Sequence, residues 1–166
     1  MNSVLERVYE IGIIPVIAFN SVDEAIPLCK ALMDGGLPAA EVTFRTACAE
    51  ECIKKIHEEL PNMLLGAGTV LTVDQADRAM AAGASEMQQA MNMGCEVVKF
   101  FPAEANGGVD KLKNIGAALK TCKWMCTGGV NAKNVNNYLG YNQIIAVGGT
   151  WMCKSDKIKA GAWDEI

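Results

Sequence analysis

Lys99 is the residue of this sequence with the clearest potential for chemistry. It stands in the segment VVKFFP, residues 97–102, which is otherwise apolar. A continuous apolar segment of this kind is typical of a strand that is buried on both faces. Burial lowers the pKa of a lysine, and a neutral amine is a nucleophile for carbonyl carbons. The alternative is a lysine at the end of a strand, with its ammonium group in solvent.

A second segment, AEVTFRT at residues 40–46, also predicts a strand that carries charge. Alternation along a strand places Glu41, Thr43 and Arg45 on one face and the apolar residues between them on the other. The alternative is an edge strand whose polar face is solvated. Two charged strands in so apolar a chain favour a shared polar site. A carboxylate and a nucleophilic lysine are the two groups that imine chemistry needs.

The composition predicts one packed globular domain over residues 1–166. The chain has 166 residues, of which 51% are hydrophobic and 20% are charged. This length is sufficient for one domain with its own core. The net charge is −4 and there is no run of basic residues, so neither a nucleic-acid surface nor a membrane surface is expected. Backbone N–H groups can still bind an anionic substrate locally.

The cysteines and the single histidine do not form a recognisable metal motif, so we expect no metal and no cofactor. His57 lies in a polar helical stretch. The seven cysteines are scattered without a CxxC pair, as is typical of thiols in a reducing cytosol: Cys29, Cys48, Cys52, Cys95, Cys122, Cys126 and Cys153. Glu6, Arg7 and Glu10 interrupt any signal peptide at the N-terminus, and no segment has the apolar length of a membrane span. We expect a cytoplasmic protein.

Short apolar segments alternate with amphipathic ones along most of the chain. We expect six strands, at residues 13–19, 40–46, 63–70, 97–100, 123–127 and 144–147. We expect helices at residues 21–33, 47–60, 72–82, 109–119 and 131–139, the first with a capping box formed by Ser21 and Glu24. Repeated strand–helix units predict a parallel sheet with helices outside it. The rhythm is broken after Ala84, where residues 85–88 open another helix with no strand before it.

Two late strands end in paired glycines, which predicts a phosphate site. The turns are Thr127-Gly128-Gly129 and Gly148-Gly149-Thr150. Glycine lets backbone N–H groups approach phosphate oxygens closely. One such pair indicates little, because a turn needs no ligand, but two on consecutive strands favour an anion. The nucleotide fingerprints GxGxxG and GxxxxGK[ST] are absent.

Five motifs, taken together and in this order, resemble the 2-keto-3-deoxy-6-phosphogluconate (KDPG) aldolase and 4-hydroxy-2-oxoglutarate aldolase family. They are EVTFRT at 41–46, GAGTV at 66–70, KFFPAE at 99–104, TGG at 127–129 and GGTW at 148–151. The resemblance implies a (β/α)₈ TIM barrel, a homotrimer and a class I aldolase that needs no metal.

The resemblance also assigns a role to each candidate residue. Lys99 is implied as the Schiff-base residue and Glu41 as the residue that moves protons. Arg45 and Thr69 are implied to hold the pyruvate end of the substrate, and Phe101 and Thr127 to line the site. The phosphate is implied to lie against the remaining turn residues: Gly128, Gly129, Gly148, Gly149 and Thr150.

The chain departs from the family pattern after Ala84. A complete barrel has about 200 residues or more. Roughly thirty residues, with the family's fourth and fifth strands, are missing here, and so is much of the last helix after Trp163. Either the deletion is real, by design or by nature, or the gene encodes a segment that this sequence lacks. We expect the visible strands to keep their barrel positions, with Lys99 and Glu41 facing one lumen. Pairing of strand 63–65 with strand 97–100 would instead indicate a smaller, re-closed barrel.

The leading hypothesis for function is an aldol lyase that cleaves 2-dehydro-3-deoxy-6-phosphogluconate to pyruvate and glyceraldehyde 3-phosphate. The presence of Lys99, Glu41 and Arg45 favours it. A first alternative is an enzyme for 4-hydroxy-2-oxoglutarate or for the galactonate epimer. A second is a catalytically dead barrel fragment that binds phosphate, and the missing pair of strands favours that.

Overall fold

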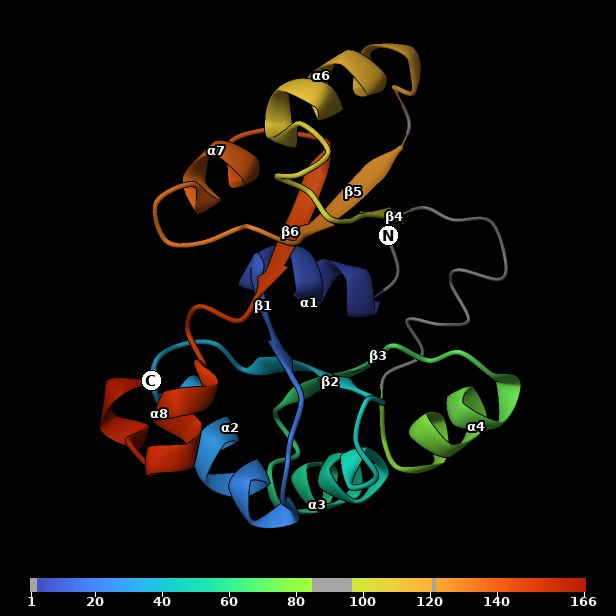
Figure 1. The fold of residues 1–166 in the computed structure, drawn as a ribbon. Helices are drawn as coiled ribbons and strands as arrows, with labels where there is room; N and C mark the ends of the chain where they lie inside the picture. Colours follow the sequence, from blue (N-terminus) through green and yellow to red (C-terminus); the bar gives the residue numbers. More distant parts are fainter. Residues whose placement is uncertain (1–2, 85–96, 121) are drawn as a thin grey trace. The chain divides into compact units, whose positions relative to one another are not determined.

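The computed structural model describes residues 3–84, 97–120 and 122–166, in which six strands alternate with helices (Figure 1). The strands are β1 (Ile13–Ile17), β2 (Ala39–Thr43), β3 (Leu64–Gly68), β4 (Val97–Phe100), β5 (Lys123–Thr127) and β6 (Ile144–Gly149). The α-helices are α1 (Ser3–Ile11), α2 (Ala25–Asp34), α3 (Ala49–Glu59), α4 (Val73–Ala81), α6 (Gly108–Ala118), α7 (Val135–Leu139) and α8 (Ser155–Ala160). Short 3₁₀ turns cover Val22–Glu24 and Trp163–Glu165.

The predicted α/β fold with six parallel strands is confirmed. The hydrogen-bonding order of the strands is β3-β2-β1-β6-β5-β4. The pairs β1–β2, β2–β3, β4–β5 and β5–β6 are all parallel. Strands β3 and β4 stand at the two ends of this order.

The chain divides into two compact units, and β1 contributes residues to both. One unit takes the described residues of 1–14 and 89–151, and the other takes those of 15–88 and 152–166. The first contains β4, β5 and β6, and the second contains β2 and β3. The single aldolase-type domain over residues 1–166 stays a prediction.

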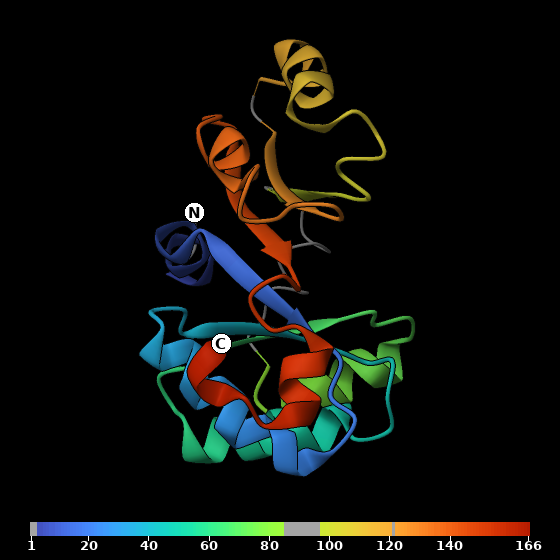
Figure 2. The same cartoon turned by 60° about the vertical axis from the view of Figure 1, so that its left-hand side comes forward.

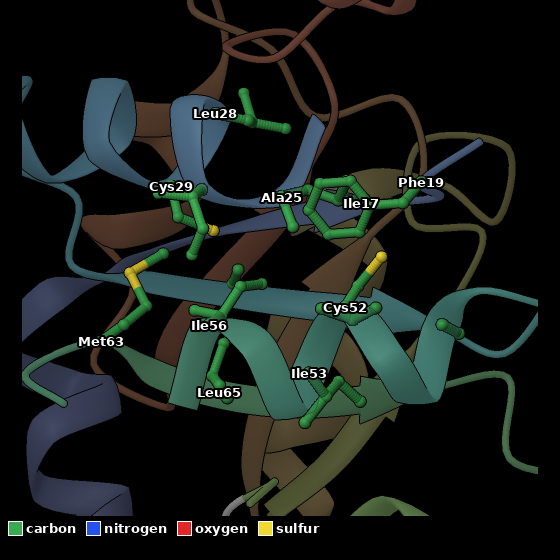
Figure 3. Packing of buried hydrophobic residues seen from close by; sticks show 14 of the residues in the cluster. Ile17, Phe19, Ala25, Leu28, Cys29, Cys52, Ile53, Ile56, Met63 and Leu65 are labelled. Carbon is green, nitrogen blue, oxygen red and sulfur yellow. The ribbon is translucent and has the colours of Figure 1, made fainter. Parts of the chain in front are cut away.

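The unit that contains β2 and β3 has its core between these strands and their helices. Helices α2, α3, α4 and α8 all lie on the same side of β2 and β3 in two views (Figures 1 and 2). Cys52, Ile53 and Ile56 recur at helical spacing on α3 and are fully buried. Figure 3 shows Ile56 and Cys52 packed towards Leu65 of β3 and Phe19 after β1. Apolar periodicity therefore accounts for this core.

The unit that contains β4 to β6 has a separate core. Its fully buried members include Leu112 of α6, Cys126 of β5, Tyr138 of α7 and Val147 of β6. Phe100 meets Trp124 edge to face, with ring centroids 6.4 Å apart. Strand β4 thus packs one of its two faces through Phe100, while Lys99 lies on the other.

The helix starts differ from the sequence predictions in their details. The expected capping box is replaced by a 3₁₀ turn: Ser21 Oγ accepts from Asp23 N–H at 3.2 Å, and the Glu24 carboxylate accepts from Asn20 N–H at 2.9 Å. In a capping box these two side chains would accept from the N–H groups of Glu24 and Ser21. Here each accepts from the residue one position earlier, because the 3₁₀ turn is tighter than an α-helical turn. The helix expected at residues 47–60 covers Ala49–Glu59. The helix expected from residue 85 lies outside the described residues.

Candidate active site

Lys99 lies in the middle of β4, beside Met125 of β5, and its side chain is exposed. The other three residues of β4 are half-buried, so the expectation of a strand buried on both faces is wrong. Within its own unit β4 pairs with β5 and with no other described strand, so its second edge, and the side chains along it, are left open to solvent there. The role of this amine therefore rests on its position and not on burial.

The strand register places Thr127 on the same face as Lys99. Lys99 pairs with Met125, and Thr127 follows two residues later on β5, opposite Gly148 of β6. Thr127 is only 5% exposed. Its hydroxyl has no hydrogen-bond partner within the described parts of the chain. A buried hydroxyl of this kind is costly unless a ligand or a water satisfies it, which makes Thr127 a ready partner for a bound molecule.

Cys126 does not compete with Lys99 as a nucleophile. It lies on the opposite face of β5 and is fully buried. Burial raises the pKa of the Cys126 thiol to about 12. The thiol therefore stays protonated near neutral pH, whereas a thiolate is the reactive form.

The Gly128-Gly129 turn packs closely against the segment that follows Lys99. Both glycines have positive φ, 94° and 82°. A Cβ on Gly128 would lie 2.8 Å from Pro102 Cα, and one on Gly129 would lie 2.6 Å from Glu104 Cβ. Backbone bonds join the two segments, from Ala103 N–H to Thr127 O at 2.8 Å and from Glu104 N–H to Gly128 O at 3.1 Å. The turn thus needs glycine for its own packing, whether or not an anion binds there.

Three residues that sequence reasoning missed hold this turn in place. Asn131 and Asn134 both donate through Nδ2 to Gly129 O, at 3.0 and 3.2 Å. Tyr138 of α7 donates its hydroxyl to the Glu104 carboxylate. The pKa of Tyr138 is raised, first by burial and then by this bond. A signal for the two asparagines was available, since they follow the glycines at a spacing typical of side-chain-capped turns.

The second glycine turn is covered by an aromatic ring. Gly148 and Gly149 belong to the end of β6. A Cβ on Gly149 would lie 2.0 Å from Cζ3 of Trp151. Thr150 is exposed. Phe101, beside the first turn, is 61% exposed. The two turns lie on neighbouring strands, because Thr127 pairs with Gly148.

In the other unit, the side chain of Glu41 lies over β3. Glu41 pairs with Gly66, and Thr43 pairs with Gly68. A Cβ built on Gly68 would meet Glu41 Oε1 at 2.2 Å. The Thr43 hydroxyl donates to Ile17 O at 3.1 Å and is buried, so it supports the strands and is not offered to a substrate.

Arg45 does not share the strand alternation of Glu41. Strand β2 ends at Thr43, and Arg45 belongs to the turn that follows. The turn brings Arg45 to Thr69, and its Nε donates to Thr69 Oγ1 at 3.1 Å. Thr69 has a positive φ of 55° at the end of β3. A non-glycine residue in this conformation is uncommon and is often found at a functional turn.

The sequence-predicted residues thus form two groups, one in each unit. Lys99, Phe101, Thr127 and both glycine turns belong to the unit of β4 to β6, and Glu41, Arg45 and Thr69 belong to the unit of β2 and β3. A common lumen for Lys99 and Glu41 stays a prediction. Within residues 3–84, 97–120 and 122–166, no cluster of His, Cys, Asp and Glu is suited to hold a metal ion. None of the helices described there has the length and apolarity of a membrane span.

Comparison with curated proteins finds relatives along the whole chain. The 2-dehydro-3-deoxy-phosphogluconate aldolase of Treponema pallidum is 34% identical over 196 residues, covering 100% of this chain and 93% of that protein. The KHG/KDPG aldolase of Escherichia coli K12 is 34% identical over 184 residues, with 93% of this chain and 86% of that protein covered. An alignment of 196 positions against 166 residues leaves about thirty positions empty in this chain, as the predicted deletion requires.

A solved structure shares both fold and sequence. The KDPG aldolase of Legionella pneumophila, captured with pyruvate as a covalent carbinolamine intermediate, has a TM-score of 0.88 and 32% sequence identity. The match covers 97% of this chain and 93% of that one.

The family model for KDPG and KHG aldolase matches in two segments, residues 4–87 and 83–166. The segments meet where the strand–helix rhythm of the sequence is broken, which locates the departure from the family near Ala84. Since these two matches together span nearly all of the sequence, and a relative at 34% identity covers all of it, this chain belongs to the KDPG and KHG aldolase family.

Proposed function

We propose that this chain is a class I aldol lyase that cleaves 2-dehydro-3-deoxy-6-phosphogluconate to pyruvate and glyceraldehyde 3-phosphate. The observation that carries the proposal is its similarity, along the full chain, to enzymes named for this substrate, with the family's lysine motif intact at Lys99. The Legionella pneumophila enzyme, with its pyruvate carbinolamine, supports the same type of chemistry.

The proposed reaction runs through an imine on Lys99. The amine attacks the C2 carbonyl of the substrate to give a carbinolamine, which loses water and becomes a protonated imine. The C3–C4 bond then breaks, its electron pair moves towards the imine nitrogen, and the C4 hydroxyl proton leaves as the aldehyde forms. The resulting enamine takes a proton at C3, and water releases pyruvate. Glu41 moves protons at carbinolamine formation and at C3.

The other candidate residues are proposed to bind the two ends of the substrate. The Arg45 guanidinium, held by Thr69, suits the pyruvate carboxylate. The buried Thr127 hydroxyl gains a partner when substrate binds, and Phe101 lines the same side. Gly128, Gly129, Gly148, Gly149 and Thr150 are proposed to hold the phosphate. The remaining features implied by the resemblance, a TIM barrel, a homotrimer and a cytoplasmic location, complete the proposal.

Covalent trapping tests the proposal directly. Pyruvate with borohydride should reduce the imine to a stable adduct at Lys99, detected by peptide mass spectrometry. Lys123 and Lys154 are internal controls, and labelling of either in place of Lys99 would overturn the assignment. A chain that is not labelled at all would favour the catalytically dead fragment. The trapping should be accompanied by a coupled assay of pyruvate release from the phosphorylated substrate.

A second candidate substrate is 4-hydroxy-2-oxoglutarate, which lacks the phosphate. The name of the Escherichia coli relative, KHG/KDPG aldolase, favours this reaction as an additional one. The two substrates share the pyruvate end and differ in the phosphate. A substitution at a residue that binds the phosphate should therefore affect only the phosphorylated substrate, whereas a substitution of Lys99 should affect both.

We expect Thr150→Val to weaken binding of the phosphorylated substrate selectively. Valine keeps the shape of threonine and removes one donor to the anion. A hydrogen bond to a charged group contributes about 1.5–3 kcal/mol, so KM for the phosphorylated substrate should rise about tenfold or more. KM for 4-hydroxy-2-oxoglutarate should stay within about twofold. Equal changes for both substrates would remove Thr150 from the phosphate site. Gly149→Val is less suitable, because its side chain would also displace Trp151.

A further inference from the structure

We propose that Gly68 is a positioning residue for the Glu41 carboxylate: the missing side chain at residue 68 provides the space in which that carboxylate lies. The proposal rests on the proposed function, in which Glu41 moves protons. It adds a residue that touches no reacting atom and acts through Glu41 alone.

The geometry shows that Glu41 fills the space over Gly68. Gly68 lies opposite Thr43 in the register, and its carbonyl accepts from Phe44 N–H at 2.8 Å. A Cβ on Gly68 would lie 2.2 Å from Glu41 Oε1 and 2.9 Å from both Cδ and Cγ. Distances below 3.0 Å are essentially never found for a real Cβ. The carboxylate and a Cβ at residue 68 therefore exclude each other.

The backbone itself does not require glycine at residue 68. Gly68 has no positive φ, in contrast to Gly128 and Gly129 of the turn after β5. Gly68 is the last residue of β3, and a glycine in a strand often marks a site where another group approaches closely. Here the approaching group is the side chain of Glu41.

The obstacle to a larger residue is flexible, and this decides what a substitution would do. The nearest atoms are the far end of the Glu41 side chain and not backbone. Thr43, the other neighbour on that face, is buried and anchored to Ile17 O. An alanine at residue 68 should therefore leave the strands in place and displace the Glu41 carboxylate.

The same strand offers a matched control. Gly66 also lacks a positive φ and lies two residues earlier, on the same face of β3. A Cβ there has only Ala40 O within reach, at 4.0 Å. Gly66→Ala and Gly68→Ala thus add the same methyl group to the same face of one strand. Only the methyl group at residue 68 would collide with the Glu41 carboxylate.

The first experiment is a double-mutant cycle on turnover. A misplacement of about 1 Å can cost a hundredfold in rate, so Gly68→Ala should lower kcat by about ten- to a hundredfold. In a Glu41→Gln background, where proton transfer is already lost, Gly68→Ala should add less than about twofold. Gly66→Ala should change kcat by less than about twofold in both backgrounds. An equal loss from Gly68→Ala in both backgrounds would overturn the proposal, as would an unchanged kcat.

The second experiment measures thermal unfolding and does not depend on activity. Any loss of stability from Gly68→Ala should be relieved by Glu41→Ala, which empties the contested space, and a Gly68→Ala chain that fails to fold should fold as the double variant. An equal loss in both backgrounds would overturn the steric argument. If this coupling is found but Glu41→Gln turns over normally, the proposed role of Glu41 fails, and the positioning role fails with it. If Glu41→Gln is slow but no coupling is found, only the Gly68 proposal fails.

Discussion

Replacing Lys99 by methionine is expected to abolish aldol cleavage, with kcat reduced by about 10⁴-fold or more. Methionine has nearly the same length and remains compatible with a half-buried strand, but it has no amine to attack the substrate carbonyl. Without the imine, the electrons of the C3–C4 bond have no acceptor. The measurement is pyruvate release from the phosphorylated substrate, together with the loss of borohydride trapping by pyruvate.

Lys123→Met is the matched control for this prediction. Lys123 begins the neighbouring strand β5, opposite Val97, and its Nζ donates to Asn142 O at 3.1 Å. Since that contact lies away from the candidate site residues of β4 and β5, the control should keep kcat within about twofold. A Lys99→Met variant that still released pyruvate at the parent rate would exclude Schiff-base chemistry at Lys99.

The second large effect is expected from Glu41→Gln, which should lower kcat by about a hundredfold or more. Glutamine fills the same space over Gly68, so the fold and the packing of β2 on β3 should be retained. It cannot exchange protons at the carbinolamine or the enamine carbon. Imine trapping at Lys99 over long incubation should largely persist, which separates a loss of proton transfer from a loss of binding.

A carboxylate elsewhere in the same unit controls for the loss of one charge. Glu50 of α3 accepts from Arg78 Nε at 2.7 Å at the surface. Glu50→Gln removes the same charge and should leave kcat within about twofold, because surface ion pairs contribute little. If Glu41→Gln and Glu50→Gln behaved alike, the proton-transfer role would have to be assigned to another group.

The sequence by itself determined the strands, the alternation of strands with helices and the family of this chain. These are local properties: apolar runs predict the strands, helical spacing predicts the buried face that carries Cys52 and Ile56, and paired glycines predict the turn after β5 and the end of β6. The break after Ala84 was also predicted from the sequence, because two helical segments follow each other there with no strand between them. The comparisons confirm that break in two ways. The alignment with the Treponema pallidum enzyme is about thirty positions longer than this chain, and the family model matches in two segments that meet near Ala84.

Contacts between strands were decided only by the tertiary structure. Alternation placed Arg45 on the face of Glu41, but β2 ends at Thr43 and a turn carries Arg45 to Thr69 instead. A run of apolar residues predicted a buried Lys99, but a run cannot tell whether a second strand lies beside it, and β4 ends the strand order.

The placement of Glu41 over Gly68 shows the same limit most clearly. Whether the Glu41 carboxylate lies over Gly66 or over Gly68 depends on the register of β2 against β3 and on the direction in which the Glu41 side chain leans along the strand. Neither quantity is encoded in the spacing of residues within one strand. A motif can therefore name the acid, but only the packing of two strands determines where its carboxylate lies.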